Sequence, residues 1–96
     1  LRRANDRLVT RNSDSAVVRT GRMLVELASM KMRHSGPSGT FELALTQNDL
    51  AGWIGATRES TARALARFRR AGLVETGRGY ITVLDVVGLN QLVAAS

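Results

Sequence analysis

The sequence predicts a small α+β domain that is mainly helical, in which a pair of helices is followed by a β-hairpin. Apolar residues recur at helical spacing in several stretches. Threonines and glycines stand where such helices would begin and end. A Gly-Arg-Gly segment separates two short apolar runs, as the turn of a hairpin does. The length of 96 residues suits one domain of this kind.

Two helices are predicted in the first third of the chain. Leu1–Val9 mixes charged and apolar residues and is expected to be the end of one helix. The polar stretch Thr10–Asp14 breaks the pattern, and Ser13 or Asp14 is a good N-cap for the next helix. From Ser15 to about Arg33, apolar residues return at helical spacing. Their stripe consists of Val17, Gly21, Leu24 and Ala28, widened by Val25, Leu27 and Met32.

A loop and a short strand follow. His34–Gly39 contains Pro37 and two glycines, which favour a loop. Thr40–Leu45 alternates apolar and polar residues and predicts a strand. Thr46 then begins a helix, and Asp49 three positions later resembles a capping box in which Asp replaces Glu.

The central pair of helices is separated by a glycine. Leu50 and Ile54 mark the inner face of the first helix, and Gly55 supplies the left-handed turn that ends it. Thr57 caps a second helix that extends to about Ala71, where Gly72 ends it. Two helices joined by about three residues around a glycine form the helix-turn-helix pattern.

A hairpin and a last helix complete the chain. The predicted strands are Leu73–Thr76 and Tyr80–Leu84, joined by the tight turn of residues 77–79. Asp85 can cap a short final helix, whose apolar residues are Val86, Leu89 and Val93. Because a hairpin directly after a helix-turn-helix is a wing, the predicted architecture is a winged helix-turn-helix.

The second helix of the pair has the features of a DNA-recognition helix. At about 100° per residue, one side is expected in the core, with Thr61, Ala64, Leu65 and Phe68. The opposite side carries Glu59, Arg63, Ala66 and Arg70, flanked by Ala62 and Arg67. Since the N-terminal part of such a helix meets base edges in the major groove, the candidate base-reading residues are Arg58, Glu59, Ser60 and Arg63. Candidate contacts to the DNA backbone are Thr46, Gln47, Thr57, Arg67, Arg70 and Arg78.

Two alternatives to DNA reading stay open at this point. The basic side of the helix could be an ordinary solvated face, although its place between a glycine turn and a hairpin favours contact with DNA. A winged helix could also serve as a protein-interaction module that binds an acidic partner. The net charge of +6, with 13 Arg and one Lys, suits a polyanionic partner.

Composition argues against several other classes of protein. The chain has no Cys and a single His, His34, so we expect neither a metal site nor a catalytic centre, and hence no enzyme. No apolar run approaches the roughly 20 residues of a membrane span. The absence of Cys fits an intracellular protein, and a cytoplasmic one is expected. The first residue is not Met, which suggests a piece of a longer protein. Trp53 is either a half-buried packing residue, which we favour, or a partner contact, and Met23, Met30 and Met32 are expected in or beside the core.

Leu45–Leu84 resembles the C-terminal DNA-binding domain of the Crp/Fnr superfamily of bacterial transcription regulators. The resemblance is carried by Leu45-Thr46, Asp49-Leu50-Ala51, the run Ile54–Thr61, Arg63, Ala71–Val74 and Gly77–Asp85. The resemblance implies that Arg58, Glu59 and Arg63 form the Arg-Glu-x-x-x-Arg set that reads a half-site containing G/C pairs. The chain departs from the family in the large Trp53, in Gln47 at a frequently basic position, and in a wing with Arg78 alone as its basic residue.

The resemblance also implies an organisation for the full-length protein. Residues 1–12 would be the end of a dimerisation helix and a hinge, and residues 13–96 the winged helix-turn-helix domain. The partners implied are a palindromic double-stranded DNA site, a second copy in a homodimer, and RNA polymerase. The family pattern places a β-roll sensor domain, which binds a cyclic nucleotide or another effector, before Leu1, and no cofactor is expected in these 96 residues.

Overall fold

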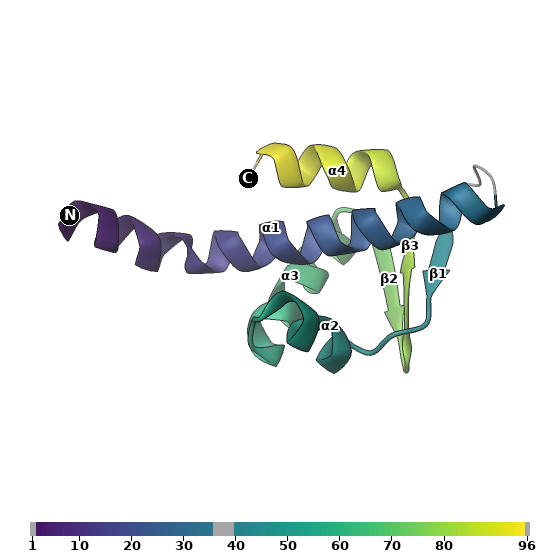
Figure 1. The fold of residues 1–96 in the computed structure, drawn as a ribbon, viewed down its shortest axis with the longest axis horizontal. Helices are drawn as coiled ribbons and strands as arrows, with labels where there is room; N and C mark the ends of the chain where they lie inside the picture. Colours follow the sequence, from purple (N-terminus) through teal and green to yellow (C-terminus); the bar gives the residue numbers. More distant parts are fainter. Residues whose placement is uncertain (1, 36–39, 96) are drawn as a thin grey trace.

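The computed structural model describes the backbone of residues 2–35 and 40–95 and the side chains of residues 16–34 and 40–95. The elements, in chain order, are α1 (Arg2–Ser35), β1 (Phe41–Leu43), α2 (Gln47–Ile54), α3 (Arg58–Arg70), β2 (Val74–Gly77), β3 (Tyr80–Val83) and α4 (Val86–Ala95). Figure 1 shows α1 as a long rod, with α4 along one side of it and α2, α3 and the sheet on the other. The predicted mainly helical α+β class is confirmed.

The helix α1 is continuous, so the predicted break at Thr10–Asp14 is wrong. Ser13 and Asp14 lie inside the helix and are not its N-cap. This polar stretch contains neither Gly nor Pro, and its residues cost at most about 0.7 kcal/mol each relative to Ala in a helix. Helical hydrogen bonds on both sides are enough to carry the backbone through. The division into residues 1–12 and 13–96 falls within this one helix and stays a prediction.

The sheet has three antiparallel strands in the order β1-β3-β2. Phe41 and Val74 both pair with Val83, and Leu43 and Thr76 both pair with Ile81. The two strands of the wing are joined by a turn at Arg78 and Gly79, where Gly79 has a φ of 82°. The bounds of β2 and β3 lie within one residue of those predicted, whereas β1 ends two residues before the predicted Leu45. The predicted loop runs into residues 36–39, which lie outside the described part of the chain.

The strand β1 lies at one edge of the sheet, and Lys31 covers part of that edge. Lys31 Nζ donates a hydrogen bond of 2.8 Å to the backbone oxygen of Glu42. An exposed edge strand invites pairing with another chain, and a lysine over the edge is one of the devices that discourage it. The same contact also joins the last turns of α1 to the sheet.

The core lies where α1 meets α3, α4 and the sheet. The predicted stripe of α1 is confirmed, because Val17, Gly21, Leu24 and Ala28 are all buried. At Gly21, α1 and α4 pack closely, since a Cβ atom there would overlap the side chain of Val93. At the start of α4, Asp85 Oδ1 accepts a hydrogen bond of 2.9 Å from the Gly88 N–H, as predicted for an N-cap.

Two expectations about large side chains fail. Trp53, predicted to pack, is 56% exposed, and Met30, predicted in or beside the core, is 46% exposed. The side chains of Met23 and Met32 pack against the core as predicted. Helical spacing places a residue on a face of its own helix, but it does not tell whether a neighbouring element covers that face. No helix within residues 2–35 and 40–95 has the length and apolar character needed to cross a membrane.

Candidate nucleic-acid interface

The capping box at the start of α2 is confirmed. The backbone N–H of Asp49 donates to Thr46 Oγ1 at 2.9 Å, and the N–H of Thr46 donates to Asp49 Oδ2 at 3.1 Å. These bonds satisfy two backbone donors that have no partner within the helix. The first turn of α2 is therefore fixed where the chain leaves the sheet, with Thr46 exposed and Gln47 half-buried.

The turn between α2 and α3 depends on Gly55, as predicted. Its φ of 68° and ψ of 35° lie in the left-handed region, where a side chain would be strained. The chain then turns back, and the N–H of Ala56 donates to the backbone oxygen of Ala51 at 3.0 Å. This turn sets the angle at which α3 leaves α2.

The predicted cap of α3 is also confirmed. Thr57 Oγ1 accepts a hydrogen bond from the Ser60 N–H at 3.0 Å and donates its own hydrogen to Ser60 Oγ at 2.9 Å. Because the Thr57 hydroxyl is used twice within the helix, a phosphate would have to replace one of these bonds. The sequence pattern alone does not reveal this competition.

The two faces of α3 are those predicted from helical spacing. Thr61, Ala64, Leu65 and Phe68 are fully buried. The exposed side chains of this helix carry all its charges, and they are Arg58, Glu59, Arg63, Arg67, Arg69 and Arg70. Ala62 and Ala66 are half-buried, and their small side chains would let a flat or convex partner come close to the helix backbone.

A short chain of polar contacts joins the cap of α3 to its second turn. Arg63 Nη2 donates to Ser60 Oγ at 3.4 Å, a long and therefore weak bond. Ser60 Oγ thus accepts from both Thr57 and Arg63, which leaves its own hydrogen to donate to a bound acceptor. Arg63 is exposed, so its guanidinium keeps further N–H groups for a ligand.

Several candidate residues line one hollow of about 320 Å³ between α3 and α1. Ser60, Arg63, Arg67 and Arg70 form its α3 side, and Ala16 and Val17 belong to α1. Arg58, Glu59, Thr46, Gln47 and the wing residue Arg78 are not among its lining residues. The structure therefore gathers part of the predicted set along one flank of α3 and leaves the rest at the helix start, at α2 and in the wing.

The structure adds one residue that the sequence analysis missed. Arg69 Nη1 donates a hydrogen bond of 3.0 Å to Thr76 Oγ1 in β2. The bond ties the last turn of α3 to the wing. The sequence does contain a feature from which this contact could have been predicted. The connection Ala71–Leu73 is so short that β2 must begin beside the end of α3. Within the side chains that the structure describes, no group of three His, Cys, Asp or Glu residues comes together as metal ligands.

Comparisons with known proteins agree with this geometry. Residues 18–92 match the family described as the Crp-like helix-turn-helix domain. Electron transport regulator A of Shewanella oneidensis is 38% identical over 52 residues, which are 54% of this chain and 21% of that protein. The transcriptional regulator SdrP of Thermus thermophilus is 32% identical over 69 residues, which are 72% of this chain and 34% of that protein.

A solved structure of a regulator of this family has a similar fold. A transcriptional regulator of the Crp/Fnr family from Thermus thermophilus is 29% identical, with a TM-score of 0.65 over 98% of this chain and 46% of that one. The chain thus spans about a third or less of the two sequence relatives and under half of this structural one. With the family match over most of its length and the winged helix-turn-helix fold, the chain belongs to the Crp-like helix-turn-helix domain family.

Proposed function

We propose that this chain binds double-stranded DNA in a sequence-specific manner, as the output part of a transcription regulator. The observation that carries the proposal is the arrangement of α3. Its inner face is fully buried in the core, and its exposed N-terminal half presents Arg58, Glu59 and Arg63 beside the half-buried Ser60. A helix that is fixed in the core and carries Arg and Glu at its start presents hydrogen-bond donors and acceptors that can pair with those on the base edges in the major groove.

The roles within the interface follow from chemistry and position. Arg58 and Arg63 can each bind guanine through two N–H groups, Glu59 can accept from the cytosine amino group, and Ser60 can donate its free hydrogen. We propose that the remaining candidates contact phosphates and so hold the helix in the groove: Thr46, Gln47, Thr57, Arg67, Arg70 and Arg78. Ala62 and Ala66 allow the close approach.

The relatives support a wider proposal for the whole protein. Both sequence relatives named above are regulators, and the chain spans only part of each. We propose a homodimer on a palindromic site, with RNA polymerase as a further partner and no catalytic activity. Binding to the bacterial chromosome would place the protein in the cytoplasm. A site for a cyclic nucleotide or another effector would lie outside these 96 residues.

Selection from random duplexes tests the proposal directly. The chain should enrich a common half-site from a random DNA library, and mobility shifts with that site should weaken steeply between about 50 and 200 mM salt. A matched variant with Arg58→Ala and Arg63→Ala should lose the enrichment while keeping residual binding. If the unmodified chain binds no duplex at either salt concentration, a protein-interaction module is the better description.

A further inference from the structure

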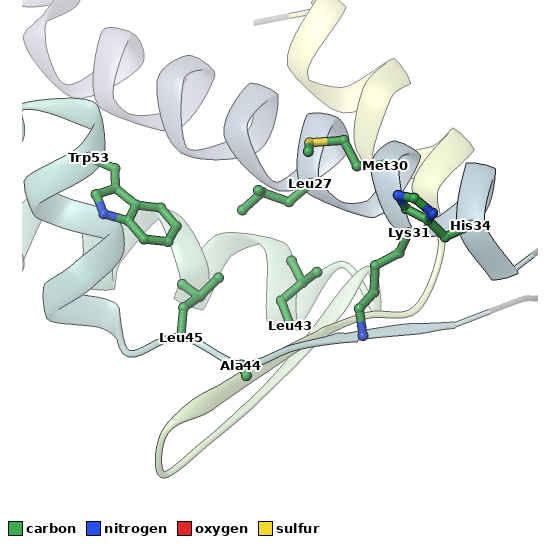
Figure 2. Close-up of a pocket in the computed structure, with 8 residues that line it drawn as sticks. All are labelled: Leu27, Met30, Lys31, His34, Leu43, Ala44, Leu45 and Trp53. Carbon is green, nitrogen blue, oxygen red and sulfur yellow. The ribbon is translucent and has the colours of Figure 1, made fainter.

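A second hollow lies between α1, α2 and β1, and none of its lining residues belongs to α3 or the wing. It has a volume of about 390 Å³, within the range of about 300–1,000 Å³ that ligand-binding clefts occupy. Figure 2 shows its arrangement, with Leu27 of α1 facing Leu43 and Leu45, and Met30 beside Leu27. We refer to this hollow as the α1–β1 groove. The proposed DNA interface leaves it without a role.

The two ends of the α1–β1 groove differ in chemistry. Trp53 stands at one end, and Lys31 and His34 stand at the other (Figure 2). None of the lining residues carries a carboxylate. The Lys31 ammonium uses one hydrogen for the backbone oxygen of Glu42, at 2.8 Å, and has two more to donate. The groove therefore suits an apolar group with an anionic group beside it.

Exposed apolar side chains form part of the rim of the α1–β1 groove. Met30 is 46% exposed and Trp53 is 56% exposed, and both border the groove. Met and Trp are enriched at protein interfaces, and a patch of apolar surface bordered by polar groups is typical of a docking site. A small acid lying in the groove would leave the outer sides of both residues in water, whereas a protein segment would cover them.

We propose that the α1–β1 groove binds a segment of a partner protein that carries an apolar side chain and a nearby carboxylate. The apolar side chain lies between Met30 and Trp53, and the carboxylate accepts hydrogen bonds from Lys31. Because the groove carries the positive charge of Lys31 and no carboxylate among its lining residues, an acidic segment should bind better than a basic or neutral one. This docking site is separate from the proposed DNA interface, so its test requires no DNA.

A pair of synthetic peptides tests the proposal. The first is a capped amphipathic helix of about 12 residues with Leu on one face and Glu beside it, and the second has Gln in place of every Glu. Trp53 is the only tryptophan of the chain, so its fluorescence reports on the groove. The Glu peptide should shift the Trp53 emission to shorter wavelength and move the amide resonances of Leu43–Leu45. The Gln peptide should bind about threefold more weakly, as expected for one exposed ion pair.

Two matched variants locate the contact. Lys31→Met removes the charge and keeps most of the side-chain stem, and it should abolish the preference for the Glu peptide. Arg78→Met makes the same change of charge in the wing turn and should leave the preference unchanged. Trp53→Ala, followed by amide resonances, should weaken both peptides about tenfold, as truncation of an interface anchor does. The dispersion of the amide spectra shows in each case that the variant is folded.

Several results would overturn the proposal. One is the absence of any Trp53 shift at millimolar concentrations of the Glu peptide. Another is equal binding of the two peptides, or shifts confined to the arginines of α3. If 4-phenylbutyrate produced the same shifts at the same concentrations as the Glu peptide, the site would be one for small acids. Burial of Trp53 that depends on the protein's own concentration, without peptide, would assign the groove to a second copy of the chain.

Discussion

Arg69 in the last turn of α3 donates a hydrogen bond of 3.0 Å from Nη1 to Thr76 Oγ1 in the first strand of the wing. The two residues are seven positions apart, and the chain reverses between them through Gly72, whose φ is 75°. The bond joins the helix proposed to read bases to the hairpin proposed to hold the backbone. Because Arg69 is exposed, its hydrogen bond to Thr76 should add little to the free energy of unfolding. We expect the bond to matter more for the position of the wing relative to α3.

Thr76→Val should separate these two effects, because it removes the acceptor without changing any charge. We expect the free energy of unfolding to fall by about 0.5–1 kcal/mol. Binding should weaken by the same factor for every duplex sequence. The base preference should not change, since the wing is proposed to contact the DNA backbone and not the bases. Chemical denaturation and a salt series of binding isotherms measure both effects. In an Arg69→Met background the same change should have no further effect on stability, and full additivity would contradict the contact.

Arg63→Ala should weaken specific binding by about 1–3 kcal/mol and blur one position of the half-site. Arg63 is exposed on the proposed base-reading side and hydrogen-bonds only weakly to Ser60, so its removal costs the fold little. Selection from a random library, before and after the substitution, measures the preference at each position. An unchanged preference at every position would assign Arg63 to the DNA backbone.

Arg78→Ala should act in a different way. Arg78 lies in the turn of the wing, away from the hollow that Arg63, Arg67 and Arg70 line. As one phosphate contact, it should weaken all sequences alike and lower the slope of log affinity against log salt by about one. Titrations at four salt concentrations measure the slope. An altered base preference with the slope retained would show that the wing reads bases.

The features that could be predicted from the sequence are those set by residues close along the chain. Three caps and turns depend on bonds within three or four residues: the capping box of Thr46 and Asp49, the turn at Gly55 and the cap at Thr57. All three features were found as predicted. The fully buried side of α3 followed from spacing alone. Local rules sufficed there because the competing conformations lack these bonds.

The features that could not be predicted depend on neighbours distant in sequence. Trp53 is exposed because α1 and β1 leave a groove beside it, which the pattern of α2 does not reveal. The Arg69 contact depends on where the hairpin lies. The expected break at Thr10–Asp14 failed for the opposite reason, since a weak local signal was outweighed by the continuous helix around it.

Thr46→Ala should destabilise the domain by about 1 kcal/mol, because it removes the side-chain half of the capping box. Asp49→Ala removes the reciprocal bond and should cost a similar or smaller amount. Since both act on the first turn of α2, their effects should not add fully. Thermal or urea unfolding of the two single variants and the double variant measures the coupling. Strict additivity would show that the two bonds act independently.

Two glycine-to-alanine substitutions should have opposite effects on stability. At Gly21, the added Cβ overlaps Val93 and lies 3.2 Å from Phe68 Cζ, so α1 and α4 must move apart. We expect Gly21→Ala to cost about 1–3 kcal/mol, as overpacking of a core does. At Gly52, in α2, no other part of the described chain beyond the helix's own backbone and the two adjacent residues lies within 4 Å of the added atom. Gly52→Ala should therefore stabilise by about 0.5–1 kcal/mol through the higher helix propensity of Ala.

A second substitution distinguishes overpacking at Gly21 from other causes. Val93→Ala alone should destabilise, because it removes buried methyl groups. Combined with Gly21→Ala, it removes the atom with which the new Cβ collides, so the double variant should be more stable than the sum of the two losses predicts. Urea unfolding of all four proteins gives the coupling energy. If the two losses simply added, the close packing of α1 on α4 would not be what requires glycine at position 21.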